Sequence, residues 1–292
     1  MSTRPSSWRA SRSDRLPVIA ELLAAATERL AAVSETPRLD AEVLLGQVLD
    51  RSRTWLFTWP DRVVEPAAVA AFNARVARRA AGEPVAYITG VREFWSLPLA
   101  VAPATLIPRP DTELLVATAL ARVASPAARV LDLGTGTGAI ALALASERPG
   151  WSLVAVDREP EAVALAIGNR DRLGLANVTV LASDWFAAVS GEFELIVSNP
   201  PYIDPDDPHL GEGDVRYEPA SALVAADRGL ADLAHIIAAA PDHLAPSGLL
   251  LVEHGADQGP AVRAMFAAAG FGGVETLADL GGRERVSLGS RR

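Results

Sequence analysis

Two residue types are missing from this chain of 292 residues: it has no cysteine and no lysine, so the 27 residues counted as Lys or Arg are all arginine. Without cysteine, the chain can form no disulfide and can hold no metal through thiolates. Its four histidines, which also lack the spacing of a metal site, are His209, His235, His243 and His254. We therefore expect no bound metal.

Long apolar runs are missing as well, although hydrophobic residues make up 50% of the sequence. No stretch reaches the roughly 20 apolar residues that a membrane-spanning helix needs. Residues 1–15 are rich in Ser and Arg and lack the apolar segment of a secretory signal, so we expect a disordered tail there. The sequence predicts a cytoplasmic protein with no membrane partner.

Charge is unevenly distributed along the chain. Residues 1–110 hold 14 Arg against 11 acidic residues, whereas residues 111–292 hold 13 Arg against 25, a net charge of −12. Proteins that bind nucleic acid through its phosphates need a basic surface. The second part of the chain therefore argues against direct nucleic-acid binding.

The first part of the chain predicts a small helical domain over residues 16–83. Apolar residues recur with helical spacing in 16–33 and 38–50, and a third helix fits 66–81. The pattern changes at Pro84, where three short segments with strand-like composition follow: 85–88, 93–97 and 99–101. We interpret residues 84–110 as a β-hairpin linker.

Residues 111–292 predict an α/β domain. A helix over 111–124 is followed by alternating strands and helices, which is typical of a mainly parallel sheet covered on both faces. The predicted strands are 128–133, 151–156, 177–181, 193–198, 248–253, 273–277 and 285–288, and the further helices are 138–147, 160–173, 229–243 and 257–269. The last two strands, joined through Gly281-Gly282, predict an antiparallel hairpin at the sheet edge.

A glycine-rich loop is the first motif that indicates chemistry. An apolar strand leads into Gly134-Thr135-Gly136-Thr137-Gly138, which opens a helix. Glycines let the backbone approach a ligand closely, and the helix start offers unpaired N–H groups. The loop predicts a nucleoside-like cofactor, but with Ala139 it also fits the dinucleotide pattern, and a purely structural turn is the alternative.

Acidic and aromatic residues follow the next two strands. Asp157 ends its strand, where a carboxylate can accept both ribose hydroxyls of an adenosine; the alternative is a cap for the helix after it. Asp184 and Trp185 follow the third strand, where they fit the amino group and the ring face of an adenine. Aromatic residues at such positions are most often part of the core.

The most informative motif is Asn199-Pro200-Pro201-Tyr202, directly after the apolar strand at 193–198. Proline stops the strand and stiffens the turn, so the Asn199 side chain and nearby carbonyls form rigid acceptors beside an aromatic ring. Such a turn suits a flat –NH2 group. Together, the four motifs predict a methyltransferase that uses S-adenosylmethionine (AdoMet) and acts on a planar nitrogen, whereas a nicotinamide dehydrogenase has no use for this turn.

The chain resembles the HemK/PrmC family in several further segments. These are Arg38–Glu42, Pro84–Gly90 followed by Glu93-Phe94, Leu106–Glu113, Glu218-Pro219 with Ala222-Leu223, and Asp279-Leu280 with Gly282–Arg285. The resemblance runs from about the first helix to the last strand. It implies a helical N-terminal domain that recognises substrate, a β-hairpin linker and a seven-stranded, Rossmann-like catalytic domain.

The resemblance also implies the reaction: methyl transfer to the side-chain amide of the glutamine in the Gly-Gly-Gln motif of class 1 peptide chain release factors. Asn199, Pro200 and Tyr202 are then catalytic, and with Pro201 they bind substrate. Cofactor-binding residues are Gly134, Thr135, Gly136, Thr137, Gly138, Asp157, Asp184, Trp185 and Asn199. The alternatives are an adenine-N6 DNA or RNA methyltransferase and an AdoMet-fold protein without catalytic activity.

Two features next to these motifs are left open by the sequence. Arg109 either pairs with Asp111 or Glu113 as a structural clamp, which we favour, or approaches the carboxylate of the cofactor. Residues 203–220 are acidic and rich in proline. They are either a solvated loop or part of the mouth that receives the release-factor tip.

Overall fold

The computed structural model describes residues 15–292, so the disordered tail expected over residues 1–15 lies, apart from Arg15, outside the described residues. The chain divides into two compact units, one ending at Thr89 and the other running from Gly90 to Arg292. Residues 84–110, predicted as a linker, divide between these units. No helix within residues 15–292 is long and apolar enough to cross a lipid bilayer.

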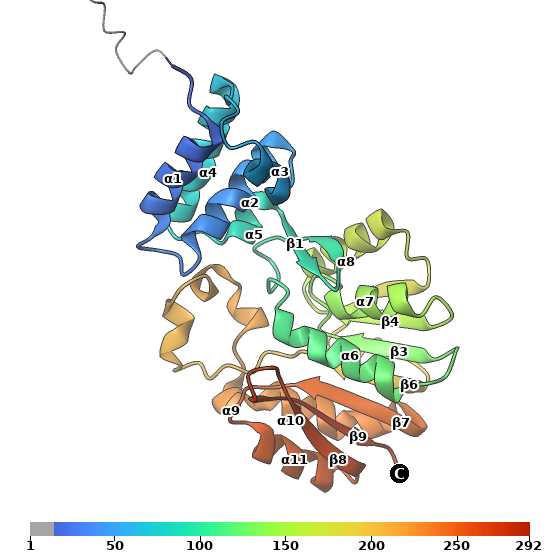
Figure 1. The fold of residues 1–292 in the computed structure, drawn as a ribbon. Helices are drawn as coiled ribbons and strands as arrows, with labels where there is room; N and C mark the ends of the chain where they lie inside the picture. Colours follow the sequence, from blue (N-terminus) through green and yellow to red (C-terminus); the bar gives the residue numbers. More distant parts are fainter. Residues whose placement is uncertain (1–14) are drawn as a thin grey trace, which may run out of the picture. The chain divides into compact units, whose positions relative to one another are not determined.

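The first unit is helical. Its helices are α1 (Ile19–Leu30), α2 (Pro37–Leu49), α3 (Arg53–Thr58), α4 (Pro66–Ala80) and α5 (Val85–Thr89) (Figure 1). Apolar side chains from all five meet in one core that contains Leu23, Leu44, Leu56, Phe72 and Ile88. The short helix α3, which the sequence analysis missed, is held by Arg53, whose guanidinium donates to the buried carboxylate of Glu42 at 2.8 Å.

The strand predicted over residues 85–88 is wrong, because these residues form helix α5. The amide of Ile88 donates to the carbonyl of Pro84 at 3.1 Å, and the Thr89 hydroxyl donates to the carbonyl of Val85 at 2.9 Å. Short runs rich in β-branched residues fit a buried helical turn as well as a strand. Here the burial of Ile88 against the helical core favours the helix.

The second unit begins with an antiparallel hairpin formed by β1 (Val91–Phe94) and β2 (Leu97–Ala100). The sequence analysis ran one strand from Glu93 to Leu97, straight through the turn. Trp95 and Ser96 both have positive φ, 51° and 60°, as a two-residue hairpin turn requires. Such turns are usually marked by Asn-Gly or Asp-Gly, so Trp-Ser gave no signal of the turn.

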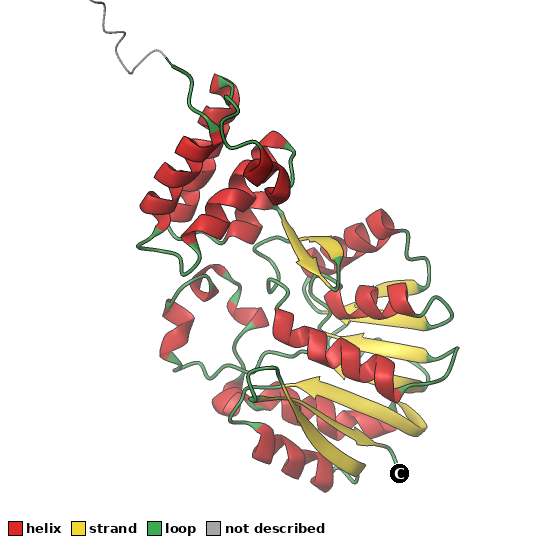
Figure 2. Cartoon of the chain, viewed as in Figure 1, coloured by secondary structure: helices red, strands yellow, loops and turns green. Residues whose placement is uncertain are grey.

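A seven-stranded sheet forms the core of the second unit (Figure 2). Its strands are β3 (Arg129–Leu133), β4 (Ser152–Asp157), β5 (Val178–Ala182), β6 (Phe193–Ser198), β7 (Leu244–Glu253), β8 (Gly272–Ala278) and β9 (Glu284–Ser290). Their order is β5-β4-β3-β6-β7-β9-β8. The strand β9 runs antiparallel to both of its neighbours, β7 and β8, whereas the five strands from β5 to β7 in this order pair in parallel. The predicted α/β fold class is confirmed, as is the closing antiparallel pair, in which β8 is the edge strand.

Helices cover both faces of this sheet, as buried apolar strands require. On one face of the sheet, a core joins buried strand residues such as Val130 and Leu153 to α6 (Glu113–Arg122), α7 (Ala139–Glu147) and α8 (Pro160–Leu173). The other core joins Leu131 and Ile196 to α10 (Ala231–Ala239) and α11 (Gly259–Ala268). Helix α6 starts after a 3-10 turn at Pro110–Thr112, and α10 follows a short turn, α9 (Ala226–Gly229), so both are shorter than predicted.

The strand order places a switch point between β3 and β6. The chain moves from β3 outward through β4 to β5, then returns to β6 on the other side of β3. Ligands of open α/β sheets bind in the crevice outside the carboxyl ends of the strands at such a point. The Gly134–Gly138 loop follows β3 and Asn199 follows β6, so the fold itself brings these two motifs together.

Candidate active site

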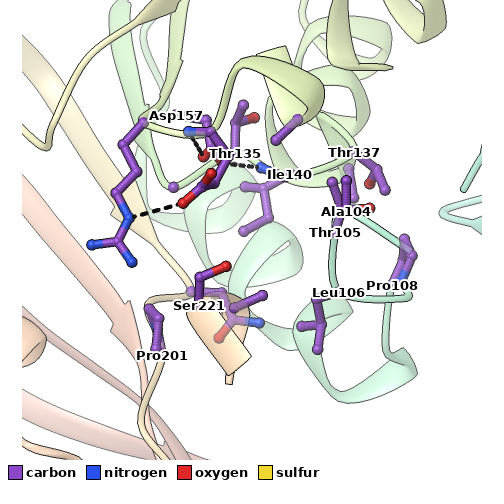
Figure 3. Close-up of a pocket in the computed structure, with 18 of the residues that line it drawn as sticks. Ala104, Thr105, Leu106, Pro108, Thr135, Thr137, Ile140, Asp157, Pro201 and Ser221 are labelled. Atoms are coloured by element: carbon purple, nitrogen blue, oxygen red, sulfur yellow. Dashed lines mark hydrogen bonds and ion pairs between the residues drawn. The ribbon is translucent and has the colours of Figure 1, made fainter. Parts of the chain in front are cut away.

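A pocket of about 910 Å³, counted with its part open to solvent, lies at this switch point. Figure 3 shows that Thr135 and Thr137 of the glycine-rich loop, Asp157 at the end of β4 and Pro201 after β6 surround it. The segment from Ala104 to Pro108 and Ser221 close its other sides.

The glycine-rich loop is shaped by three left-handed residues. Gly134, Gly136 and Gly138 have φ of 69°, 55° and 86°. A Cβ added to Gly134 would come within 3.3 Å of the Trp185 indole ring. A side chain at this position would therefore both strain the backbone and push against Trp185. The loop residues 134–137 line the pocket, whereas Gly138 is the N-cap of α7 and is not among the lining residues.

Asp157 joins the loop to the end of β4. Its Oδ2 accepts from the amide of Gly136 at 2.9 Å, and its Oδ1 accepts from the amide of Glu159 at 3.0 Å. The residue therefore holds the loop and the start of α8 in place. Each carboxylate oxygen can accept a second hydrogen bond, so these contacts leave capacity for two ligand hydroxyls on the pocket side.

Asp184 and Trp185 line the same pocket. Asp184 is exposed, and Trp185 is half-buried with a φ of 47°, which turns the backbone sharply after β5. The ring packs against Gly134 and is not enclosed in the core. The structure thus brings together the glycine-rich loop, Asp157, Asp184 and Trp185, as the sequence analysis expected.

Asn199 directly follows the last residue of β6. It lines the pocket, and its Nδ2 donates to the Thr112 hydroxyl at 3.1 Å. Pro201 also lines the pocket, whereas Pro200 is buried and Tyr202 is not among the lining residues. The Tyr202 hydroxyl instead donates to Oε1 of Glu253 at 3.2 Å, and burial together with the Glu253 charge raises its pKa.

Arg109 pairs with Glu218, and not with Asp111 or Glu113 as the sequence analysis expected. Glu218 is buried and also accepts from the amide of Ile107 at 3.0 Å. Burial raises the pKa of Glu218, and the Arg109 charge opposes that rise. The Arg109–Glu218 pair spans 109 residues of sequence and ties the 203–220 segment to a wall of the pocket, which Arg109 also lines.

Two buried acids lie at the carboxyl ends of strands. Asp132 on β3 accepts from the Thr135 hydroxyl at 2.6 Å and from the amide of Ala141 at 3.2 Å. Glu253 ends β7. Burial raises the pKa of each to about 7. Sequence reasoning gave neither acid a role, although an acid that ends an apolar strand, as Glu253 does, was a visible signal.

The fold and this site define a class, the methyltransferases built on a seven-stranded sheet. A methyltransferase from Pyrococcus furiosus superimposes with a TM-score of 0.53 at 19% identity, covering 75% of this chain and 98% of that one. At this identity the likeness concerns the fold alone. A family model described as the methyltransferase small domain matches residues 110–211.

The chain belongs to the release factor glutamine methyltransferase family. It is 57% identical over 257 residues to the release factor glutamine methyltransferase of Salmonella typhimurium, covering 88% of this chain and 93% of that protein. It is 61% identical to that of Pseudomonas aeruginosa over the same shares of both chains. The PrmC N-terminal domain model matches residues 21–90. The resemblance to the HemK/PrmC family is confirmed.

Proposed function

We propose that this protein transfers a methyl group from AdoMet to the side-chain amide nitrogen of the glutamine in the Gly-Gly-Gln motif of class 1 peptide chain release factors. The observation that carries the proposal is Asn199. It lines the pocket at the switch point, and its Nδ2 is bound to the Thr112 hydroxyl, so its carbonyl oxygen can accept from a ligand. Membership of the family supports the choice of acceptor.

The residues that line the pocket fit AdoMet. Asp157 keeps acceptor capacity for the ribose hydroxyls, and Trp185 with Asp184 offers a ring face and a carboxylate for the adenine. Gly134 in the loop has a positive φ, and a Cβ added there would come within 3.3 Å of the Trp185 ring. AdoMet, when bound, supplies a methyl group on a positively charged sulfur.

Asn199 and the Pro200 carbonyl are the groups we assign to the substrate. Both accept hydrogen bonds, and an amide –NH2 has two hydrogens to give. Pro201 forms part of the wall. Tyr202, which the family resemblance implies to be catalytic, is not among the residues that line the pocket, and its hydroxyl is bound to Glu253. We propose instead that Tyr202 supports the turn from behind.

Catalysis in this proposal comes from positioning and charge. An amide nitrogen is a poor nucleophile because its lone pair is delocalised, so the site must hold it close to the methyl group. Near-attack positioning can supply on the order of 7–11 kcal/mol. Acceptors aimed at the –NH2 hydrogens stabilise the positive charge that develops on nitrogen, which is worth about 3–4 kcal/mol per group. No general base is required, because the proton becomes acidic after methyl transfer.

Two roles outside the pocket belong to the same proposal. The helical unit that ends at Thr89 would recognise the release factor, since the family model for this domain matches residues 21–90. The enzyme would act in the cytoplasm, where release factors work. No nucleic acid, membrane or metal is part of the proposed reaction.

The test is mass spectrometry of a class 1 release factor after incubation with the protein and AdoMet. We expect one added methyl group on the Gly-Gly-Gln glutamine and none on a release factor in which that glutamine is replaced by alanine. Duplex DNA and RNA are incubated in parallel. Methylation of adenine without methylation of the release factor would support the adenine-N6 alternative and overturn the proposal.

A further inference from the structure

The two prolines of the Asn199–Tyr202 turn limit how the protein can hold this turn in place. Neither proline has an N–H, so the backbone inside the turn cannot be fixed by donating hydrogen bonds. The turn is held instead at its two ends. At one end, the Nδ2 of Asn199 donates to the Thr112 hydroxyl at 3.1 Å. At the other end, the carbonyl of Tyr202 accepts from the side chain of Gln258 at 2.9 Å.

Gln258 binds the Tyr202 carbonyl with one fixed orientation of its amide. Its Nε2 also donates to the carbonyl of Arg228 at 3.2 Å, and its Oε1 accepts from the amide of Gly255 at 2.8 Å. All three partners are backbone groups, each of which can only accept or only donate. A flipped amide would oppose every one of them, so the Gln258 nitrogen has to face Tyr202.

Gly229 meets the same carbonyl with its backbone. Its φ is 80°, and a Cβ added there would collide with the Tyr202 carbonyl oxygen and lie 2.6 Å from the carbonyl carbon. Real Cβ atoms essentially never come closer than 3.0 Å to another heavy atom. Only glycine therefore lets the chain pass this close to the Tyr202 carbonyl.

The segment that carries Gly229 has a strained backbone. Asp227 and Arg228, neither of them glycine, also have left-handed φ values, 53° and 58°. Residues with a side chain rarely adopt this conformation, and it persists only where surrounding contacts hold it. The Gly229 amide donates to the Ala225 carbonyl at 3.1 Å, and the Ala225 amide donates to the Ile203 carbonyl at 3.1 Å. The strained segment is thus fastened directly after the substrate-binding turn.

We propose that Gln258 and Gly229 brace the Tyr202 carbonyl and so hold the substrate-binding turn in its reactive position. Gln258 is the positioning residue, and Gly229 leaves the space that the contact needs. The inference rests on the proposed function, since it assigns the residues that hold the two acceptors of that reaction, Asn199 and the Pro200 carbonyl. Neither Gln258 nor Gly229 is among the residues that line the pocket, so both act through the turn.

Two replacements of Gln258 in the full chain separate its contact with Tyr202 from its contact with Gly255. Gln258→Met keeps the length of the side chain and loses both contacts. Gln258→Glu keeps an oxygen for the Gly255 amide but offers no hydrogen to the Tyr202 carbonyl. We expect kcat for release-factor methylation to fall about 10- to 100-fold in both variants, because small shifts of a reacting group cost rates of that order. A kcat within about twofold of wild type in either variant would overturn the inference.

The contrast between turnover and binding separates a displaced turn from a general loss of structure. In both Gln258 variants, KM for the release factor and the affinity for AdoMet, measured by calorimetry, should stay within about threefold of wild type. Asn177→Leu is the matched control, because Asn177 precedes β5 at the other end of the sheet and its Nδ2 also donates to backbone carbonyls, those of Ala145, Arg148 and Trp151. We expect this variant to unfold at a lower urea concentration and to keep kcat within about twofold of wild type. An AdoMet affinity that falls in parallel with kcat, or an equal fall of kcat in Asn177→Leu, would overturn the inference.

Gly229→Ala perturbs the Tyr202 carbonyl without changing Gln258. Gly270→Ala is its control, because Gly270 has a φ of 81° and an added Cβ would have no atom of the described residues within 4 Å beyond its chain neighbours. We expect kcat to fall at least about 10-fold in Gly229→Ala and to stay within about twofold in Gly270→Ala. Equal kcat in these two variants would overturn the inference. Wild-type protein that methylates no release factor would contradict the proposed function, whereas active wild type with equally active Gln258 and Gly229 variants would contradict only this inference.

Discussion

Removing Arg109 from the Arg109–Glu218 pair should lower the free energy of unfolding much more than removing Glu218. The Glu218 side chain is fully buried, whereas 34% of the Arg109 side chain is exposed. Arg109→Met leaves a buried carboxylate without its counter-charge, which typically costs about 3–5 kcal/mol. Glu218→Gln leaves an arginine that can turn to water, and the glutamine oxygen can still accept from Ile107, so the cost should be about 1 kcal/mol.

The pH dependence of the Arg109→Met variant follows from the raised pKa of Glu218. Burial already raises this pKa, and loss of the arginine removes the charge that opposes the rise. The folded state then binds the Glu218 proton more tightly than the unfolded state does. Stability is therefore lost as pH rises from the unfolded pKa of 4.5 through the folded value, and the cost of Arg109→Met should shrink as pH falls.

Hydrogen exchange measures this effect where it should occur, in peptides from residues 203–225. The pair ties this segment to Ile107, so its loss should increase local opening there before it affects the sheet. We expect a difference of about 2–4 kcal/mol in opening free energy between the two variants at pH 7.5. Equal losses in both variants, or a loss in Arg109→Met that does not change with pH, would refute this reasoning.

Three further predictions concern the pocket and its loop. Asn199→Ala should lower kcat by at least about 100-fold and leave AdoMet affinity within a few-fold, as calorimetry and methyl transfer can check; parallel loss of both would contradict the division of roles. Gly134→Ala should weaken AdoMet binding about 5- to 30-fold, because φ is 69° and the new Cβ meets Trp185 at 3.3 Å, whereas Gly168→Ala, with open space around it, should bind normally. Burial raises the pKa of Asp132 to about 7, so this side chain destabilises the folded state as pH rises from 3.8 toward 7. Asp132→Asn should therefore gain stability relative to wild type over that pH range, as urea unfolding can measure. A difference in unfolding free energy that does not change with pH would contradict the raised pKa.

The sheet was predictable because its strands are apolar runs with distinct ends. The strand at 193–198 and the helix at 160–173 were predicted with the bounds that the structure has. The errors occur where the backbone conformation is not the one that the pattern of side chains indicates. Trp95 and Ser96 take left-handed φ values without any glycine or asparagine, so no local rule marks the hairpin turn.

The sequence allowed us to predict those pocket residues that lie at the end of a strand or shortly after one. Asp157 ends a parallel strand, and Trp185 and Asn199 come after two others; parallel strands bring their carboxyl ends to one edge. The partners of these residues were not predictable, because they come from distant parts of the chain. Asn199 finds Thr112 across 87 residues, and Arg109 finds Glu218 across 109. Such pairs depend on the order of strands and loops, which no local motif records.

The turn after β6 does not by itself choose between glutamine and adenine as the methyl acceptor. Both present a flat –NH2 group next to an acceptor atom, the amide oxygen in one and a ring nitrogen in the other. Pro200 and Pro201 have no N–H, so in the proposed binding mode the turn accepts hydrogen bonds from the –NH2 group, and these two residues offer no backbone donor to the neighbouring atom. Selectivity must therefore come from the surroundings. A net charge of −12 over residues 111–292 repels the phosphates that flank an adenine in a nucleic acid, whereas a glutamine on a protein loop carries no such charge.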